Sequence, residues 1–278
     1  MTEDFIEFKK YYLEALKQVP ENSFSHKTIE HKFIHSVEVL RCGQTILQQT
    51  PELVDCSEKF SDLAQKALLF HDVGRFEEAV CHYQAQQQKV NFDEYFARYD
   101  HGELGSRILT ANPRYNDRRI LFAVKWHGKI MEEITASEDW QIAQNSPDFN
   151  EIKKILFLVR DADKLANLYR LKSENRLTKD LFYQQLSDEK IHAPISDVVL
   201  RHFYNKHSVP FSDVHSFADR IMMVVVWIYD LNYQASKRIF KENQYDEYLM
   251  EELAKFHKNS RDIAQIFQLM NEELTRCG

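Results

Sequence analysis

Apolar residues recur along this chain at the three-to-four-residue spacing of amphipathic helices, and the strict alternation that marks strands is nearly absent. The first stretch, residues 4–19, places Phe5, Phe8, Tyr12 and Leu16 on one stripe. The same spacing recurs in 25–49, in 57–71, in a block ending at His127, in a block starting near Ser146, and in 196–205, 217–241 and 260–276. The pattern predicts an all-α protein.

Residues at the ends of these stretches are typical of helix boundaries. Ser57 is a suitable N-cap for the helix that follows it. Asp100 and Glu103 match a capping box, with Glu103 at the third helical position. Pro147 fits the first position of a helix, and Gly74 is expected to end the helix that begins near Ser57.

The bulk composition excludes several classes of protein. With 6 Gly and 6 Pro among 278 residues, a barrel or sandwich of many short strands is not expected. A net charge of −7 indicates no overall basic character, so we expect no nucleic acid polymer as a partner, although net charge does not exclude a local basic patch. The most apolar run, Ile221 to Ile228, is far shorter than the ~20 residues of a spanning helix. We interpret it as a buried helix and expect no membrane contact.

Cysteine usage and the first residues predict a cytoplasmic protein. The four cysteines form no CxxC pair and are interpreted as reduced thiols. The first five residues are acidic and lack the apolar core of a signal peptide. The sequence does not indicate an oligomeric state.

The adjacent pair His71-Asp72 lies at the end of an apolar helix, where neither residue has an obvious packing role. A buried carboxylate costs several kcal/mol unless a partner compensates its charge, and a metal ion would accept both side chains as ligands. His127, Asp163 and His101 also continue apolar stripes, so they are expected to point inward. Any one of these residues alone would be interpreted as an ordinary core residue. Together they predict a metal site among facing helices.

The order of these residues resembles the HD domain family of metal-dependent phosphohydrolases. The resemblance covers about residues 31–170, and it is carried by the segments His35-Ser36, His71-Asp72-Val73-Gly74-Arg75-Phe76, Asp100-His101-Gly102-Glu103, Trp126-His127 and Arg160-Asp161-Ala162-Asp163-Lys164-Leu165. It implies a single helical HD-type domain over 1–278, with a motif core at 25–170 and a C-terminal helical extension at 190–278.

The resemblance implies a first metal ion bound by His35, His71, Asp72 and Asp163. Asp161 is an alternative ligand at this position. We prefer Asp163, because Asp163 continues the apolar stripe. In two-metal relatives, the positions of His101 and His127 bind a second ion, with Asp72 as the bridging ligand. Some two-metal relatives have His-His where this chain has Trp126-His127, and several have an acidic residue where this chain has Ala166. The sequence therefore does not decide whether one metal ion or two are bound.

This ligand set suits hydrolysis of a small phosphate ester, including a nucleotide, by a metal-activated water molecule. Imidazole-rich ligation favours a divalent transition metal such as Mn, Fe, Zn, Co or Ni. Asp72 is therefore placed in the catalytic set. Arg75 and Lys164 lie beside ligands in the sequence and are expected to contact the phosphate, with Lys129 as a third candidate.

Two other functions remain open at this point. Some HD-fold proteins use the same six ligands to hold two irons and activate oxygen, so a di-iron oxygenase is the alternative enzyme. A non-catalytic module is disfavoured because all six ligands are present. The connection up to Tyr99, which contains Phe92, Tyr95 and Phe96, is expected to form either a short core helix or an aromatic wall or lid for a nucleobase.

Overall fold

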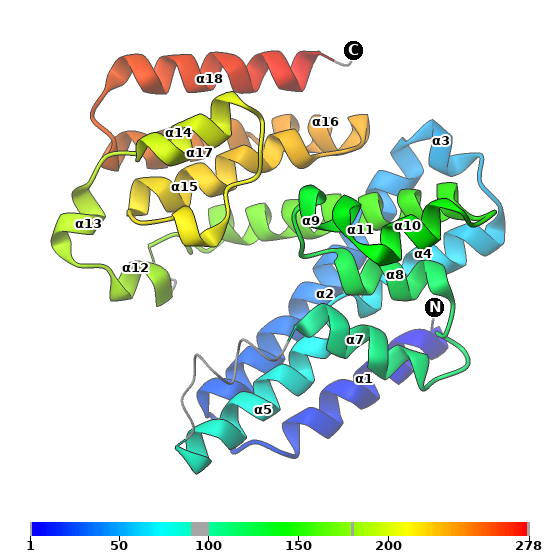
Figure 1. The fold of residues 1–278 in the computed structure, drawn as a ribbon. Coiled ribbons are helices and arrows are strands. Elements are labelled where there is room, and N and C mark those ends of the chain that lie inside the picture. Colours follow the sequence, from blue (N-terminus) through cyan, green and yellow to red (C-terminus); the bar gives the residue numbers. More distant parts are fainter. Residues whose placement is uncertain (1, 90–99, 179–180, 277–278) are drawn as a thin grey trace. The chain divides into compact units, whose positions relative to one another are not determined.

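The computed structural model describes residues 2–89, 100–178 and 181–276, and the chain is helical with no strand in these ranges (Figure 1). This confirms the all-α prediction. The chain divides into two compact units, Met1–Asp163 and Lys164–Gly278. The expectation of one domain over 1–278, with a motif core at 25–170 and an extension at 190–278, stays a prediction.

The first unit is built around one long helix, α2 (Phe24–Gln49), that contacts four others. Its helices are α1 (Thr2–Leu16), α2 (Phe24–Gln49), α3 (Pro51–Val54), α4 (Glu58–Phe70), α5 (Gly74–Gln88), α7 (His101–Thr110), α8 (Arg118–Trp126), α9 (Met131–Ala136), α10 (Glu138–Gln144) and α11 (Phe149–Ser173) up to Asp163. Helix α2 packs against α1, α3, α4 and α5, while α7 packs against α5 and α8. These contacts bring together helix ends that are far apart in the sequence.

Residues of the apolar stripes identified in the sequence form the core of this unit, although Phe5 of the first stripe is exposed. Phe8 of α1, Ile29 and Val39 of α2, and Phe60 and Leu68 of α4 are all buried. A second cluster joins α8, α9, α10 and α11, and consists of Phe122, Ile134, Trp140, Ala143, Ile152 and Leu156. Burial of such side chains stabilises a fold by about 1.5–3 kcal/mol each.

Helix caps agree with the sequence at two of the predicted positions. The Ser57 side chain accepts a hydrogen bond from the Phe60 backbone N–H and caps α4. Asp100 caps α7 by accepting from the backbone N–H groups of Gly102 and Glu103. Helix α11 begins at Phe149, so Pro147 lies before the helix, not at its first position.

The prediction for Gly74 was wrong. Helix α4 ends at Phe70, and Gly74 is the first residue of α5, which occupies part of the expected connection. A Cβ atom on Gly74 would lie 2.0 Å from the backbone oxygen of His101, and one on Gly102 would lie 2.2 Å from the backbone oxygen of Lys125. Glycine is therefore required because α5, α7 and α8 approach one another closely.

The second unit contains the remaining helices of the chain. They are the end of α11 from Lys164, α12 (Leu181–Gln185), α13 (Asp188–His192), α14 (Asp197–Tyr204), η1 (Phe211–Asp213), α15 (Phe217–Val225), η2 (Val226–Asp230), α16 (Gln234–Glu242), α17 (Tyr245–Phe256) and α18 (Ser260–Thr275). Helix α15 packs against α17, which also contacts α16 and α18. The single helix expected over 217–241 is instead α15, the 3₁₀ turn η2 and α16.

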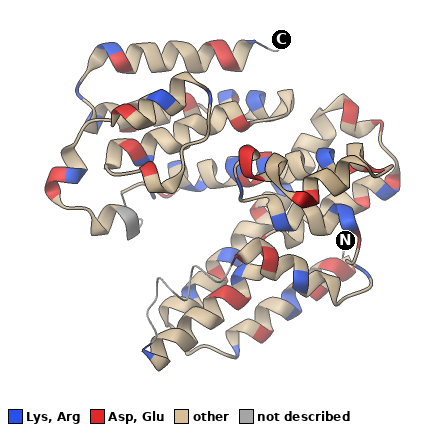
Figure 2. Ribbon diagram, in the orientation of Figure 1, with Lys and Arg blue, Asp and Glu red and all other residues tan. Residues whose placement is uncertain are grey.

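The apolar run Ile221 to Ile228 is buried within this unit, as predicted, apart from the partly exposed Met223 and Trp227. No helix among the described residues combines the length and the apolar character needed to cross a bilayer. Figure 2 shows acidic and basic residues interspersed along the helices of each unit.

Candidate metal centre

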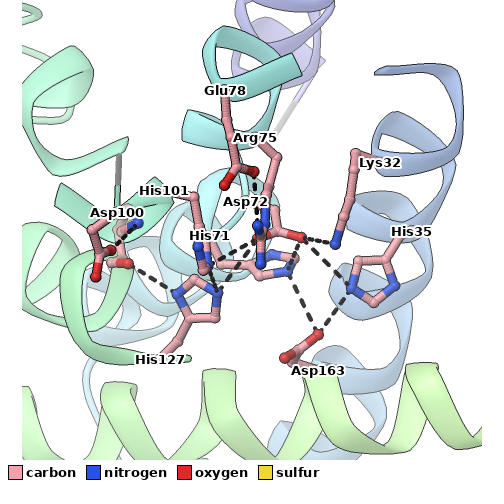
Figure 3. A network of polar contacts seen from close by, with 12 residues as sticks. Lys32, His35, His71, Asp72, Arg75, Glu78, Asp100, His101, His127 and Asp163 are labelled. Carbon is pink, nitrogen blue, oxygen red and sulfur yellow. Dashed lines mark hydrogen bonds and ion pairs between the residues drawn. The ribbon is translucent and has the colours of Figure 1, made fainter. Parts of the chain in front are cut away.

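All six residues that the sequence selected as ligands gather in one place in the first unit (Figure 3). They are His35 on α2, His71 and Asp72 directly after α4, His101 at the start of α7, His127 directly after α8, and Asp163 on α11. All except His101 and Asp163 are buried, and the side chains of these two are only 18% and 22% exposed. Two sets have ligand atoms within 4.8 Å of one another, and they are His35, His71 and Asp72 in one set and Asp72, His101 and His127 in the other.

Asp72 belongs to both sets because its two carboxylate oxygens face different histidines. Its Oδ2 atom lies 3.6 Å from His71 Nε2 and 3.9 Å from His35 Nε2. Its Oδ1 atom lies 3.6 Å from His101 Nε2 and 3.5 Å from His127 Nε2. A carboxylate placed in this way can bridge two cations.

Asp163 completes the first set from the opposite side. Its Oδ1 atom lies 2.9 Å from His35 Nε2 and 3.8 Å from His71 Nε2. The carboxylate that the apolar stripe favoured over Asp161 is therefore the one that contacts these two imidazoles.

Backbone carbonyls fix the tautomers of two of the histidines. His71 Nδ1 lies 2.9 Å from the Leu68 oxygen, and His127 Nδ1 lies 2.9 Å from the Val124 oxygen. Each oxygen belongs to the last turn of a helix, where carbonyls lack intrahelical donors. A carbonyl can only accept, so Nδ1 carries a proton in both rings, and in the neutral form of each ring Nε2 presents a lone pair toward Asp72.

The Nε2 atom of His71 is the feature of this cluster that best fits a bound metal ion. His71 Nε2 is buried and has no hydrogen-bond partner among the described residues. A buried polar atom without a partner costs about 1–3 kcal/mol, and a cation would satisfy it. Carboxylate oxygens of Asp72 and Asp163 lie within 4 Å of the same atom, so these residues could hold a metal ion.

Burial and neighbouring charges set the protonation states that metal binding requires. Burial lowers the pKa of His71 to about 4, so its imidazole is neutral at pH 7. Burial alone would raise the pKa of Asp72, but the positive charge of Lys32 is the main cause that holds this pKa well below its usual value. Burial, together with the charge of Arg75, also lowers the pKa of His101.

Two cationic side chains border Asp72. Lys32 Nζ lies 2.8 Å from Asp72 Oδ2, and Arg75 Nε lies 3.7 Å from Asp72 Oδ1. Arg75 Nη1 also donates to Glu78 Oε2 at 2.7 Å. Neither Lys32 nor Glu78 was predicted from the sequence. The available signal was helical spacing, because Lys32 precedes His35 by three residues and Glu78 follows Arg75 by three.

The HD domain family model matches residues 33–168, a range that includes all six clustered side chains. The chain carries an HD domain. The resemblance drawn from the sequence is thereby confirmed. HD domains are mostly metal-dependent hydrolases that bind divalent metals, and membership suggests phosphohydrolase activity. Comparison with curated proteins and with solved structures finds no significant match.

The two lysines that were also predicted to contact phosphate, Lys164 and Lys129, form ion pairs with other residues. Lys164 Nζ lies 2.9 Å from Asp230 Oδ2, an ion pair within the second unit. Lys129 Nζ lies 2.6 Å from Asp100 Oδ2 and so ties the turn after α8 to the cap of α7. A role for Lys164 or Lys129 in phosphate binding stays a prediction.

A buried arginine supports the histidine at the end of α8. Arg160 Nη1 donates to the backbone oxygen of His127 at 3.0 Å and to that of Lys129. These bonds hold the turn that presents His127 to Asp72. The aromatic residues Phe92, Tyr95, Phe96 and Tyr99, expected in a core helix or beside a nucleobase, lie outside the described residues.

Proposed function

We propose that this HD domain is a metal-dependent phosphohydrolase that acts on a small phosphate ester, including nucleotides. The observation that supports it most strongly is the position of Asp72, whose two oxygens face separate pairs of histidines. Two cations held by one carboxylate suit the displacement at phosphorus, in which both an attacking and a leaving oxygen need stabilisation.

In this proposal the first ion is held by His35, His71, Asp72 and Asp163, and the second by Asp72, His101 and His127. Imidazole nitrogens and carboxylate oxygens favour Mn, Fe, Zn, Co or Ni. A bound divalent ion supplies Lewis acidity and lowers the pKa of water toward neutrality.

The protein's own residues bind and orient the ester. Arg75 borders the cluster, and its side chain is 31% exposed. Glu78 accepts a hydrogen bond from only one guanidinium nitrogen, so other N–H groups remain to bind phosphoryl oxygens. Glu78 thereby positions Arg75, which is a proposed catalytic residue because it contacts the substrate.

The test is reconstitution of protein stripped of metal by a chelator. Each of Mn²⁺, Fe²⁺, Zn²⁺, Co²⁺ and Ni²⁺ is added separately, and phosphate release is measured from a panel of monoesters that includes nucleoside monophosphates. We expect at least one metal to restore hydrolysis. His71→Ala and Asp72→Asn should each lower kcat/KM by ~100-fold or more. His207→Ala, at an exposed histidine of the second unit, is the matched control and should retain activity.

Absence of phosphate release with every metal and every ester would contradict the proposal. The di-iron oxygenase alternative uses the same ligands, and metal content distinguishes it. Two irons per chain with oxygen consumption would favour the oxygenase, whereas Mn, Ni, Co or Zn with phosphate release would exclude it.

A further inference from the structure

Lys32 is the closest cation to the shared carboxylate of the site. Its Nζ atom lies 2.8 Å from Asp72 Oδ2, and its side chain is 23% exposed, compared with 4% for Asp72. Lys32 hydrogen-bonds to Asp72 alone within the part of the chain that the structure describes. Figure 3 shows it on α2 beside His35, directed at the same carboxylate as His71.

The ammonium group and the proposed first ion need the same oxygen. Asp72 Oδ2 is the atom that faces His71 Nε2 at 3.6 Å and His35 Nε2 at 3.9 Å. Two cations on one carboxylate oxygen repel each other strongly in a site from which water is largely excluded. An imidazole in its neutral form does not share this conflict. A divalent ion at Oδ2 therefore favours departure of the ammonium group.

The lysine side chain has the properties that such a departure requires. Its flexible four-carbon stem can redirect the charge, and its partial exposure gives the ammonium group access to solvent at the rim of the site. An ammonium group displaced from Asp72 needs another anion. The phosphoryl group of a substrate bound at the same cluster is the anion that the proposed function supplies.

We propose that Lys32 is an exchangeable cation, which pairs with Asp72 until a divalent ion takes that carboxylate and then binds the phosphoryl oxygens of the substrate. This inference rests on the proposed function. The proposed role of Lys32 differs from that of Arg75, because a second ion pair of 2.7 Å, to Glu78, holds the Arg75 guanidinium in place. Lys32 has the freedom to change partners.

The first experiment measures metal affinity without turnover. Protein stripped of metal is titrated with Co²⁺, and binding is followed by visible absorption. Lys32→Met removes the competing charge, so we expect Co²⁺ to bind roughly tenfold more tightly, the scale of one hydrogen bond to a charged group. Lys32→Arg retains the charge and should stay within about threefold of the unchanged protein. Lys27→Met, at an exposed position of the same helix, is the matched control and should have no effect.

The second experiment measures anion affinity, again without turnover. Inorganic phosphate is titrated by calorimetry into Co²⁺-loaded protein. Lys32→Met should weaken phosphate binding by roughly tenfold, and Lys27→Met should not change it. The opposite signs of the two effects are the signature of exchange. A residue that only orients Asp72 would weaken metal binding when it is removed.

The possible outcomes are distinguishable. Tighter Co²⁺ binding and weaker phosphate binding by Lys32→Met support the inference. Unchanged or weaker Co²⁺ binding, or unchanged phosphate binding, overturns it while the proposed function stands. If the unchanged protein binds no Co²⁺, Mn²⁺ or Zn²⁺, both proposals fail. Circular dichroism spectra and thermal melting verify that each variant is folded. If Lys32→Met is unfolded, Lys32→Gln replaces it in the same measurements.

Discussion

Replacement of Arg160 by methionine tests whether a buried cation holds the turn that carries His127. Arg160 is only 2% exposed. Its Nη1 atom donates to two backbone oxygens of the turn after α8, those of His127 and Lys129. Methionine keeps a long apolar stem in the core but removes the donors. Both carbonyls then lose a charged hydrogen-bond partner.

The expected cost follows from these two bonds. A hydrogen bond to a charged group contributes about 1.5–3 kcal/mol, so loss of two gives about 3–6 kcal/mol. Since folded domains are stable by only about 5–15 kcal/mol, such a loss is large. The turn should also position His127 less well, and we expect weaker binding of the second proposed ion.

The assay is urea unfolding at pH 7, followed by circular dichroism, with Co²⁺ titration of the same samples. Arg118→Met is the matched control, because Arg118 is 54% exposed and pairs with Asp148 at the surface. Surface pairs contribute about 0–1 kcal/mol. If Arg160→Met lowers the free energy of unfolding by less than about 1 kcal/mol, or no more than Arg118→Met, the reasoning is refuted.

Three further substitutions test how the helices present the site. Gly74→Ala should destabilise the protein by about 1–3 kcal/mol or more, because the added Cβ would lie 2.0 Å from a backbone oxygen of α7. In the control Gly128→Ala, the added Cβ has its nearest contact at 3.3 Å and should change the urea midpoint little, so equal effects of the two variants would contradict the steric argument. Ser57→Ala should cost about 1 kcal/mol in thermal melts and Ser57→Asp almost nothing, whereas equal losses would argue against capping of α4. Hydrogen bonds from Arg119 lower the pKa of Asp117, so the wild type should be more stable than Asp117→Asn at pH 7 and should lose this advantage as the pH falls below about 4 through the folded-state pKa. If urea unfolding gives the same difference in stability at pH 7 and about pH 3, this linkage is refuted.

Five of the six clustered residues were selected from the sequence by a local signal, whereas His35 was selected by the family resemblance alone. His71, His127 and Asp163 continue apolar stripes, and a polar residue on a buried stripe requires a partner. Helical periodicity was sufficient to place them inward. Their mutual distances and the shared role of Asp72 depend on packing between helices, which no local pattern contains.

Several elements were not predictable for physical reasons. Helix α5 contains the buried polar residues Glu78 and His82, which interrupt its apolar stripe. The run from Phe217 onward stays apolar from α15 into η2, so the hydrophobic pattern does not show where α15 ends. Gly74 was interpreted from its local preference for helix ends, whereas its function is to allow contact with α7.

Lys32 shows the same limit at the site. A lysine on a partly exposed helix face is ordinarily solvated, and only the tertiary structure brings it to within 2.8 Å of a carboxylate 40 residues away. Lys164 shows the converse, since its place beside Asp163 in the sequence gave no indication of its ion pair with Asp230.

The most direct test of the account is an X-ray structure of the protein soaked in Mn²⁺ or Co²⁺, with anomalous scattering recorded to locate the metal. The proposed metal centre requires an anomalous peak within coordination distance of His35, His71, Asp72 and Asp163, with a second peak beside His101 and His127 when both positions bind. A metal-soaked crystal with no anomalous peak at Asp72 would contradict it.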